Sequence, residues 1–157
     1  MSRTTRYQGA IVQGHQILLI LHREHVGGKS YWVIPGGGRE PGEGEEACVR
    51  REMREETHLE VEVVRLLLDR EGFPGGVYKR LKTYLCRAIG GEARPGFEPE
   101  EEAAHEYAIV DVGWFDLREP GSWEPRLASD PITVPLLMSI RNSLGYADAV
   151  RKESSKS

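Results

Sequence analysis

The stretch "GGGREPGEGEEACVRREMREETHLEV", from Gly36 to Val61, decides the fold of this chain. It places eight glutamates and four arginines between a glycine triplet and an alternating apolar segment. A proline and a glycine close the loop, and glutamates then crowd the first turn, where negative charge favours the positive end of a helix dipole. We therefore predict a helix from about Gly44 to Thr57, followed by a strand that begins at Leu59.

Three carboxylates gather on one face of this helix. Glu52, Glu55 and Glu56 fall within an arc of about 100°, because residues three and four apart are neighbours on a helix. Like charges at this spacing destabilise a helix, and a solvent-exposed face neutralised by arginines such as Arg51 is the ordinary explanation. The glycine loop directly before the helix favours a site instead. Carboxylates and loop carbonyls are the hard oxygen ligands that Mg²⁺ or Mn²⁺ prefers.

The rest of the chain alternates between strand patterns and one more helix. Pro131 stands near the start of that second helix, as proline often does. This order predicts an α/β or α+β layered domain in which helices cover a mixed sheet. The first two strands form a pair joined by a tight turn. The predicted strands are 6–13, 16–23, 30–34, 59–72, 77–91 and 106–117, and the second helix covers 130–144.

Length and composition indicate one ordinary globular domain. With 157 residues, 39% hydrophobic and 29% charged, we expect a single domain over 1–146 and a disordered tail over 147–157. The formal net charge of -4 gives no reason to expect nucleic acid or a membrane as partner. The longest apolar run, "ILLIL", is too short to span a bilayer. Cys48 and Cys86 do not make a disulfide framework, so a reducing cytoplasm is the expected location.

The opening stretch resembles the signature of the Nudix hydrolases. That signature reads Gly, five residues, Glu, seven residues, Arg-Glu, an apolar residue, any residue, Glu-Glu, any residue, Gly and an apolar residue. The matching residues here are Gly37, Glu43, Arg51, Glu52, Met53, Glu55, Glu56 and Leu59. The surrounding strands resemble the family's mixed sheet sandwiched between helices over about 7–144. The departure is His58, which stands where the family has a helix-ending, left-handed glycine. Histidine tolerates that conformation at a cost of about 1 kcal/mol.

The resemblance implies metal-dependent hydrolysis of the diphosphate linkage in a nucleoside diphosphate derivative, with water attacking phosphorus. It implies Mg²⁺ or Mn²⁺ as cofactor, held by Glu52, Glu55, Glu56 and the Gly37 carbonyl. Arg51 would join these glutamates as the catalytic group, and Glu43 would help Arg51 to hold the loop in register. Members of the family are often dimers, so a homodimer is one arrangement that the resemblance implies.

The general base and the substrate stay open at this point. The base could be a helix glutamate or one on the later acidic loop, which carries Glu98, Glu100, Glu101, Glu102 and Glu106. Arg23 and Lys79 could contact phosphate and Trp32 could stack on a nucleobase, but surface or core roles fit these residues as well. Nucleoside triphosphates, oxidised nucleotides, dinucleoside polyphosphates and ADP-ribose all contain the reactive bridge. Pro74, 15 residues after Leu59, is similar to a proline of the family's ADP-ribose pyrophosphatases.

Two classes of protein other than an enzyme fit the sequence less well. A non-catalytic nucleotide sensor or scaffold with this fold generally loses charged positions of the signature, whereas this chain keeps all of them. A calcium-binding acidic module would need an alternating Asp and Asn loop, which is absent from the sequence. Both comparisons favour an enzyme.

Overall fold

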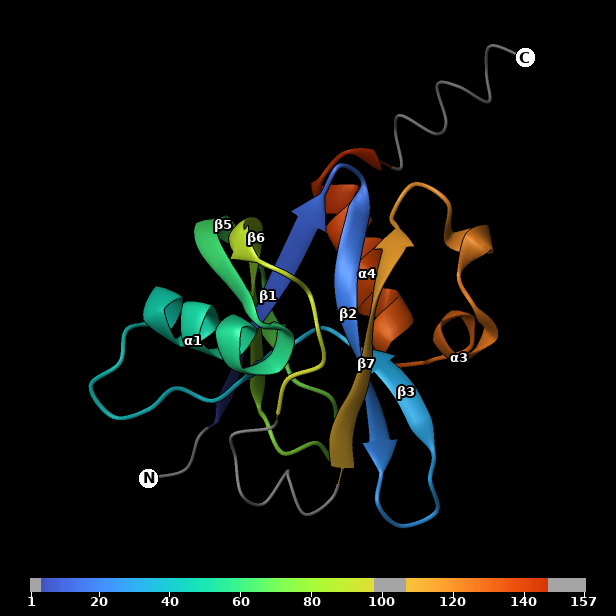
Figure 1. Cartoon of the computed structure of the whole chain (residues 1–157), viewed down its shortest axis with the longest axis horizontal. Helices are drawn as coiled ribbons and strands as arrows, with labels where there is room; N and C mark the ends of the chain where they lie inside the picture. The colour runs from blue at the N-terminus through green and yellow to red at the C-terminus, as the bar shows by residue number, and fades with distance from the viewer. Residues whose placement is uncertain (1–3, 98–106, 147–157) are drawn as a thin grey trace.

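The computed structural model describes residues 4–97 and 107–146. Strands lie between helix α1 on one side and helices α3 and α4 on the other (Figure 1). The helices are α1 (Glu45–Thr57), α3 (Pro125–Ala128) and α4 (Thr133–Ser143). The predicted mixed sheet between helices is confirmed. The prediction for the tail, 147–157, lies outside the described residues.

Seven strands form the sheet in the order β3-β2-β1-β6-β5, with β4 paired to β1 and β7 paired to β2. β1 and β6 are parallel and the other pairs are antiparallel. The strands are β1 (Thr5–Gln13), β2 (Gln16–Glu24), β3 (Ser30–Val33), β4 (Gly36–Gly37), β5 (Leu59–Glu71), β6 (Arg80–Gly91) and β7 (Tyr107–Asp116).

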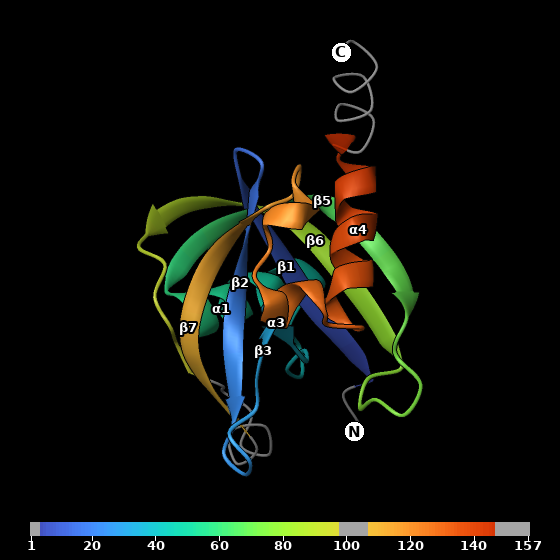
Figure 2. The ribbon, with the colours of Figure 1, turned by 90° about the vertical axis from the view of Figure 1, so that its right-hand side faces the viewer.

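β1 belongs to both halves of the sheet. Residues 5–11 of β1 pair with β6, whereas only Val12 and Gln13 pair with β2, next to the tight turn. Gly14 has a φ of 63° in that turn, a conformation that glycine adopts without strain. The predicted strand pair is therefore confirmed, but its strands diverge. Figure 2 shows β7 beside β2, and the long strands β5 and β6 curving behind them.

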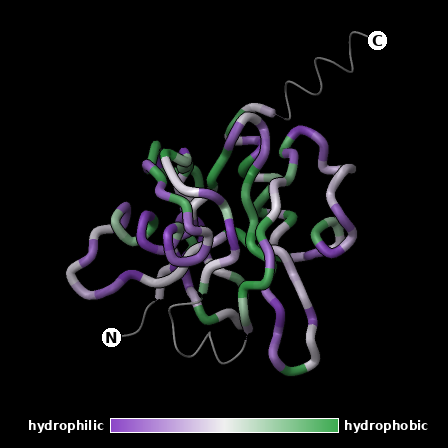
Figure 3. Tube along the Cα trace, viewed as in Figure 1, coloured by the Kyte–Doolittle hydropathy of each residue, from purple (hydrophilic) through white to green (hydrophobic). Residues whose placement is uncertain are grey.

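Helix α1 is anchored by a close contact with β1. Cys48, Val49 and Met53 are fully buried on the helix and share a cluster with Tyr7 of β1. Met53 packs directly on Gly9, where an added Cβ would lie 2.5 Å from its Sδ. This packing holds the helix against β1, and Figure 3 shows the hydrophobic residues concentrated along the central strands.

A second cluster lies under α3 and α4. Leu127 of α3, Leu137 and Ile140 of α4 and Trp123 bury themselves against Leu19 of β2. Because β2 is covered on both faces, its apolar residues form a continuous run rather than an alternation. No helix in the described part of the chain is long and apolar enough to cross a membrane.

The structure corrects three details of the predicted order. Three short elements were missed: β4, the 3₁₀ turn Pro120–Ser122 and α3. β6 begins at Arg80 because a turn precedes it, in which Gly76 N–H donates to Phe73 O, and Val77 is 85% exposed. Helix α4 begins at Thr133, after a turn in which Asp130 Oδ1 accepts the N–H groups of Ile132 and Thr133 at 2.8 and 2.9 Å.

Candidate active site

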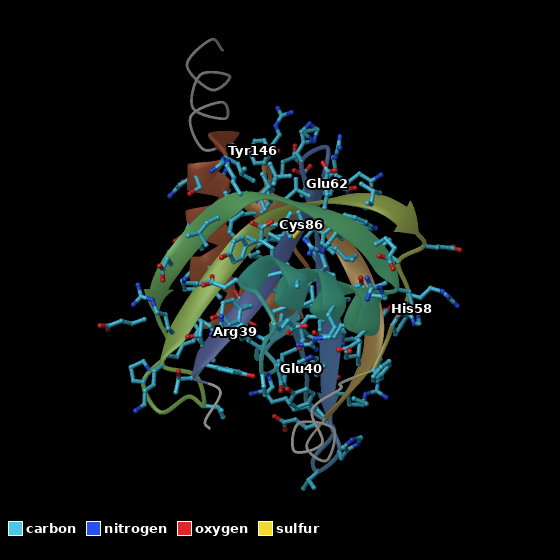
Figure 4. All side chains as sticks on the ribbon, turned by 90° about the vertical axis from the view of Figure 1, so that its left-hand side faces the viewer. Arg39, Glu40, His58, Glu62, Cys86 and Tyr146 are labelled. Carbon is cyan, nitrogen blue, oxygen red and sulfur yellow. The ribbon has the colours of Figure 1, made fainter. Side chains whose placement is uncertain are left out.

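Helix α1 ends as the sequence predicts, at a left-handed residue. His58 has φ 64° and ψ 14°, and its N–H donates to Arg54 O at 3.1 Å. Its side chain is exposed, and Figure 4 shows it at the end of the helix, with Arg39 and Glu40 in the loop below. The prediction of His58 as the residue that ends the helix is confirmed.

Arg51 fastens the glycine loop to the helix. Its Nε and Nη2 donate to the two carboxylate oxygens of Glu43 at 2.7 and 2.8 Å. Nη2 also donates to Gly38 O at 3.1 Å. The hydrogen bonds from Arg51 hold the pKa of Glu43 below its usual range, and Glu43 in turn raises the pKa of Arg51. Both groups are therefore ionised at neutral pH, and the bidentate pair fixes the loop.

The same guanidinium reaches two glutamates of the acidic face. Nη1 of Arg51 donates to Glu52 Oε1 and to Glu55 Oε2, both at 3.1 Å. Burial raises the pKa of Glu55, and the charge of Glu52 adds to this, while Arg51 opposes it. Glu40 Oε1 also lies 3.8 Å from Nη1, so one cation meets four carboxylates and negative charge remains in excess on this face.

Glu52 is the most constrained group of the site. Its side chain is fully buried, and Oε2 has no hydrogen-bond partner among the described residues. Gly37 lies directly against this carboxylate, because a Cβ added to Gly37 would lie 2.5 Å from Glu52 Oε1. Pairing of β4 with β1 holds Gly37 opposite Tyr7. An unpartnered buried carboxylate oxygen costs free energy unless a cation meets it.

These donors fit Mg²⁺ or Mn²⁺ by their chemistry. Glu52 and Glu56 are both fully buried, Glu55 lies beside them on the helix, and backbone carbonyls of the glycine loop add hard oxygens. In residues 4–97 and 107–146, no three carboxylate, imidazole or thiolate groups are already gathered closely enough to hold an ion by themselves. The match between this site and a divalent cation therefore rests on the buried oxygen of Glu52 and on the presence of hard oxygen ligands.

The predicted substrate contacts lie on elements other than α1. Arg23 lies on β2 and Lys79 just before β6, and both are exposed. Trp32 is only 4% exposed, packs edge-on against Phe115 at 4.9 Å and donates its indole N–H to Glu124. An enclosed ring offers no face to a nucleobase, so the stacking hypothesis for Trp32 is corrected to core packing.

The predicted loop glutamates, Glu98 to Glu106, lie outside the described residues. The segment just before them is tied to the end of α1. N–H groups of Arg94, Gly96 and Phe97 donate to the carbonyls of Thr57, Glu56 and Glu55 at 3.0, 2.9 and 3.0 Å, in that order. These bonds satisfy carbonyls that the end of a helix otherwise leaves without partners.

Sequence reasoning missed Arg6, and it considered His22 only as a phosphate contact or a surface residue. Nη2 of Arg6 donates to Ile34 O at 2.9 Å. His22 is buried, stacks on Tyr107 at 4.1 Å and meets Tyr31 edge-on at 5.6 Å. Burial, together with the charge of Arg6, lowers the pKa of His22 to about 3, so the imidazole is neutral. No local pattern marks either residue, because their neighbours come from distant segments.

Comparison with known proteins agrees with this geometry. The family model described as the NUDIX domain matches residues 4–134. An ADP-ribose pyrophosphatase of Mycobacterium tuberculosis is 29% identical over 104 residues, which cover 66% of this chain and 47% of that protein. The chain thus spans about half the length of this curated relative.

Solved structures share the fold. An ADP-ribose pyrophosphatase from Streptococcus suis is 24% identical with a TM-score of 0.65, and the match covers 91% of this chain and 92% of that one. A MutT NUDIX hydrolase from Burkholderia pseudomallei is 25% identical with a TM-score of 0.59, covering 87% of this chain and 95% of that one.

Proposed function

This chain belongs to the Nudix family, and on that premise we propose that it hydrolyses the diphosphate linkage of a nucleoside diphosphate derivative. ADP-ribose is the first candidate substrate, because two proteins similar to this chain carry the name ADP-ribose pyrophosphatase. The observation that carries the proposal is the fully buried Glu52 carboxylate, which lies against Gly37 with one oxygen unpartnered among the described residues.

The residues of the site support this reaction in distinct ways. Glu52, Glu55, Glu56 and the Gly37 carbonyl would hold the divalent cation. When bound, Mg²⁺ or Mn²⁺ would neutralise the negative charge of the diphosphate bridge and orient the attacking water. Arg51 maintains the spacing of loop and helix, because it contacts Glu43 as well as two of the helix glutamates.

The general base that accepts a proton from the attacking water has two candidates. Glu55 is the helix glutamate that meets solvent, with 22% of its side chain exposed, so a water molecule can reach it. A glutamate among Glu98 to Glu106 is the alternative, because the residues just before that segment are hydrogen-bonded to the end of α1. Glu55→Gln compared with each loop variant in single-turnover assays would separate the two.

The test of the function is a panel of compounds that share the bridge. ADP-ribose, a nucleoside triphosphate, an oxidised nucleotide and a dinucleoside polyphosphate are incubated with Mg²⁺, Mn²⁺ or chelator, and the products are separated by chromatography. We expect cleavage of at least one compound with a divalent cation and none in chelator. Absence of product from every compound, with protein shown to be folded by circular dichroism, would contradict the proposal.

A matched pair of variants locates the activity. Glu52→Gln should lower turnover by orders of magnitude, because it removes the charge proposed to hold the cation. Glu62→Gln is the control, since Glu62 lies on β5 across α1 from Glu40 (Figure 4) and forms an exposed ion pair with Arg87. It should retain activity within about twofold of the wild type. Binding of a nucleotide without turnover in the wild type would indicate a sensor instead.

A further inference from the structure

An ion pair joins the first turn of α1 to strand β6. Lys82 Nζ donates to both carboxylate oxygens of Glu45, at 3.0 and 3.2 Å. The hydroxyl of Tyr84, two residues further along β6, donates to Glu45 Oε1 as well. Lys82 and Glu45 are half-buried and Tyr84 is buried. The start of the helix is therefore attached to the sheet by three directional hydrogen bonds to one carboxylate.

The strand partners of Lys82 lead to the candidate metal site. Lys82 pairs with Tyr7 in the register of β6 and β1, and Tyr7 pairs with Gly37 in the register of β1 and β4. The three residues therefore form one row across the sheet. Gly37, at one end of the row, lies directly against the Glu52 carboxylate. Lys82, at the other end, holds Glu45.

Helix α1 connects the two ends of this row. Glu45 and Glu52 are seven residues apart, so they share a face of the helix and are separated by about 10.5 Å along its axis. Two strand spacings amount to about 9.5 Å, so a helix that runs across the strands can meet both ends of the row at once. Figure 1 shows α1 oriented across β1 rather than along it. The contact at Glu45 therefore determines how far α1 is shifted along its axis.

We propose that Lys82 is a positioning residue for the metal site: through Glu45, it holds α1 at the position that keeps the Glu52 carboxylate against Gly37. The proposal rests on the proposed function, because it takes Glu52 as a ligand of the cation. Lys82 lies on β6, outside the signature, and is assigned no contact with the cation or the substrate.

The other contacts near the start of α1 are less directional. The N-cap residue, Gly44, makes no side-chain hydrogen bond. Met53 packs on Gly9, and apolar packing of this kind does not depend on direction. A hydrogen-bonded ion pair does depend on direction, so the contacts from Lys82 and Tyr84 define the position of the helix more narrowly than packing does.

Two neutral variants separate position from charge. Lys82→Met removes a positive charge, which by itself would favour binding of a cation nearby, whereas Glu45→Gln removes a negative charge, which by itself would disfavour it. If the contact positions Glu52, both variants should instead weaken the binding of Mg²⁺. We expect the Mg²⁺ midpoint, the concentration that gives half of the thermal stabilisation by Mg²⁺, to rise by about tenfold in each, as when the outer support of a metal site is lost.

The measurement is a set of thermal melts across a magnesium titration, with no nucleotide present. Lys82→Arg should restore most of the wild-type behaviour, because a guanidinium can donate to the same carboxylate. Arg80→Met is the matched control on the same strand. It removes an exposed ion pair with Asp69 and should leave the Mg²⁺ midpoint unchanged.

A double variant tests whether the two residues act through one contact. Lys82→Met combined with Glu45→Gln should bind Mg²⁺ about as weakly as either single variant, because each single change already removes the ion pair. Tyr84→Phe removes one hydrogen bond to the same carboxylate and should raise the Mg²⁺ midpoint as well. It replaces Lys82→Met as the deciding variant if Lys82→Met does not fold.

Three results would overturn the proposal. An unchanged Mg²⁺ midpoint, with equal losses of stability in chelator and in saturating Mg²⁺, would mean that the ion pair only stabilises the fold. Shifts of the midpoint in opposite directions for Lys82→Met and Glu45→Gln would mean that only charge matters. A wild type that gains no stability from Mg²⁺ would contradict the metal site itself and this inference with it, whereas the first two results leave the metal site intact.

Discussion

Replacing Glu52 by glutamine should separate the stability of the fold from the stability gained by binding a cation. Two effects oppose each other in the metal-free protein. The variant loses the charge-assisted bond from Arg51 Nη1, at 3.1 Å, but Arg51 keeps its bonds to Glu43 and Glu55. The variant also no longer buries a carboxylate with one oxygen unpartnered within the described residues. Burying such a group destabilises the fold by about 1–3 kcal/mol, so its removal is favourable. We expect these effects to cancel nearly completely.

Magnesium should reveal the difference. A cation at a hundredfold excess over its dissociation constant stabilises the folded state by about 2.7 kcal/mol. For a domain of this size 1 kcal/mol corresponds to roughly 2–4 °C, so the wild type should gain roughly 5–11 °C. Glu52→Gln should gain much less, because a neutral amide is a poorer ligand than a carboxylate.

The assay is a set of thermal melts of the wild type, Glu52→Gln and Glu62→Gln, each in chelator and in magnesium. Glu62→Gln should follow the wild type in both conditions, since its carboxylate is exposed and paired with Arg87. If Glu52→Gln melted far below the wild type in chelator and gained as much from magnesium, Glu52 would be a structural ion-pair partner of Arg51. The reasoning about a cation site would then be refuted.

Three further perturbations follow from the geometry. Gly37→Ala should abolish most of the thermal stabilisation by magnesium and lower activity by about a hundredfold, because the added Cβ would displace the Glu52 carboxylate. Gly44→Ala is the control and should match the wild type, because the space at its Cβ is open. His58→Gly should raise the free energy of unfolding by about 1 kcal/mol in denaturant titrations and leave activity within a few-fold; a loss of turnover would show a role in the site. The folded-state pKa of His22 is about 3, below the usual 6.5, so the unfolded state binds a proton first as pH falls. Stability should therefore decline from about pH 6.5 to about pH 3, by up to about 1.4 kcal/mol per pH unit, and His22→Phe should flatten this decline; an unchanged slope in urea titrations would contradict it.

The local features of helix α1 could be predicted from the sequence. Its observed span, Glu45–Thr57, lies within one residue of the prediction. The left-handed end at His58 was predicted as well. Each of these features depends on residues within a few positions of one another, where dihedral preferences and helical periodicity act directly.

Other predictions failed because burial is a property of the whole fold. The aromatic strand pattern around Trp32 fits either a core position or a binding surface. In the fold, Trp32 packs against Phe115 and donates to Glu124, which places it in the core. Helix α3 has only four residues, Pro125–Ala128, which is too short for a helical period to appear.

By itself, the sequence determined which chemical groups this protein gathers on one helix, because the spacing along a helix fixes which side chains share a face. It determined the family as well, through the order of the glycine, arginine and glutamates. Only the tertiary structure decided that Glu52 lies buried against Gly37 and that Gly37 pairs with Tyr7. Those contacts join β1, β4 and α1, and they depend on strand pairing and on packing between Gly9 and Met53, which no local pattern encodes.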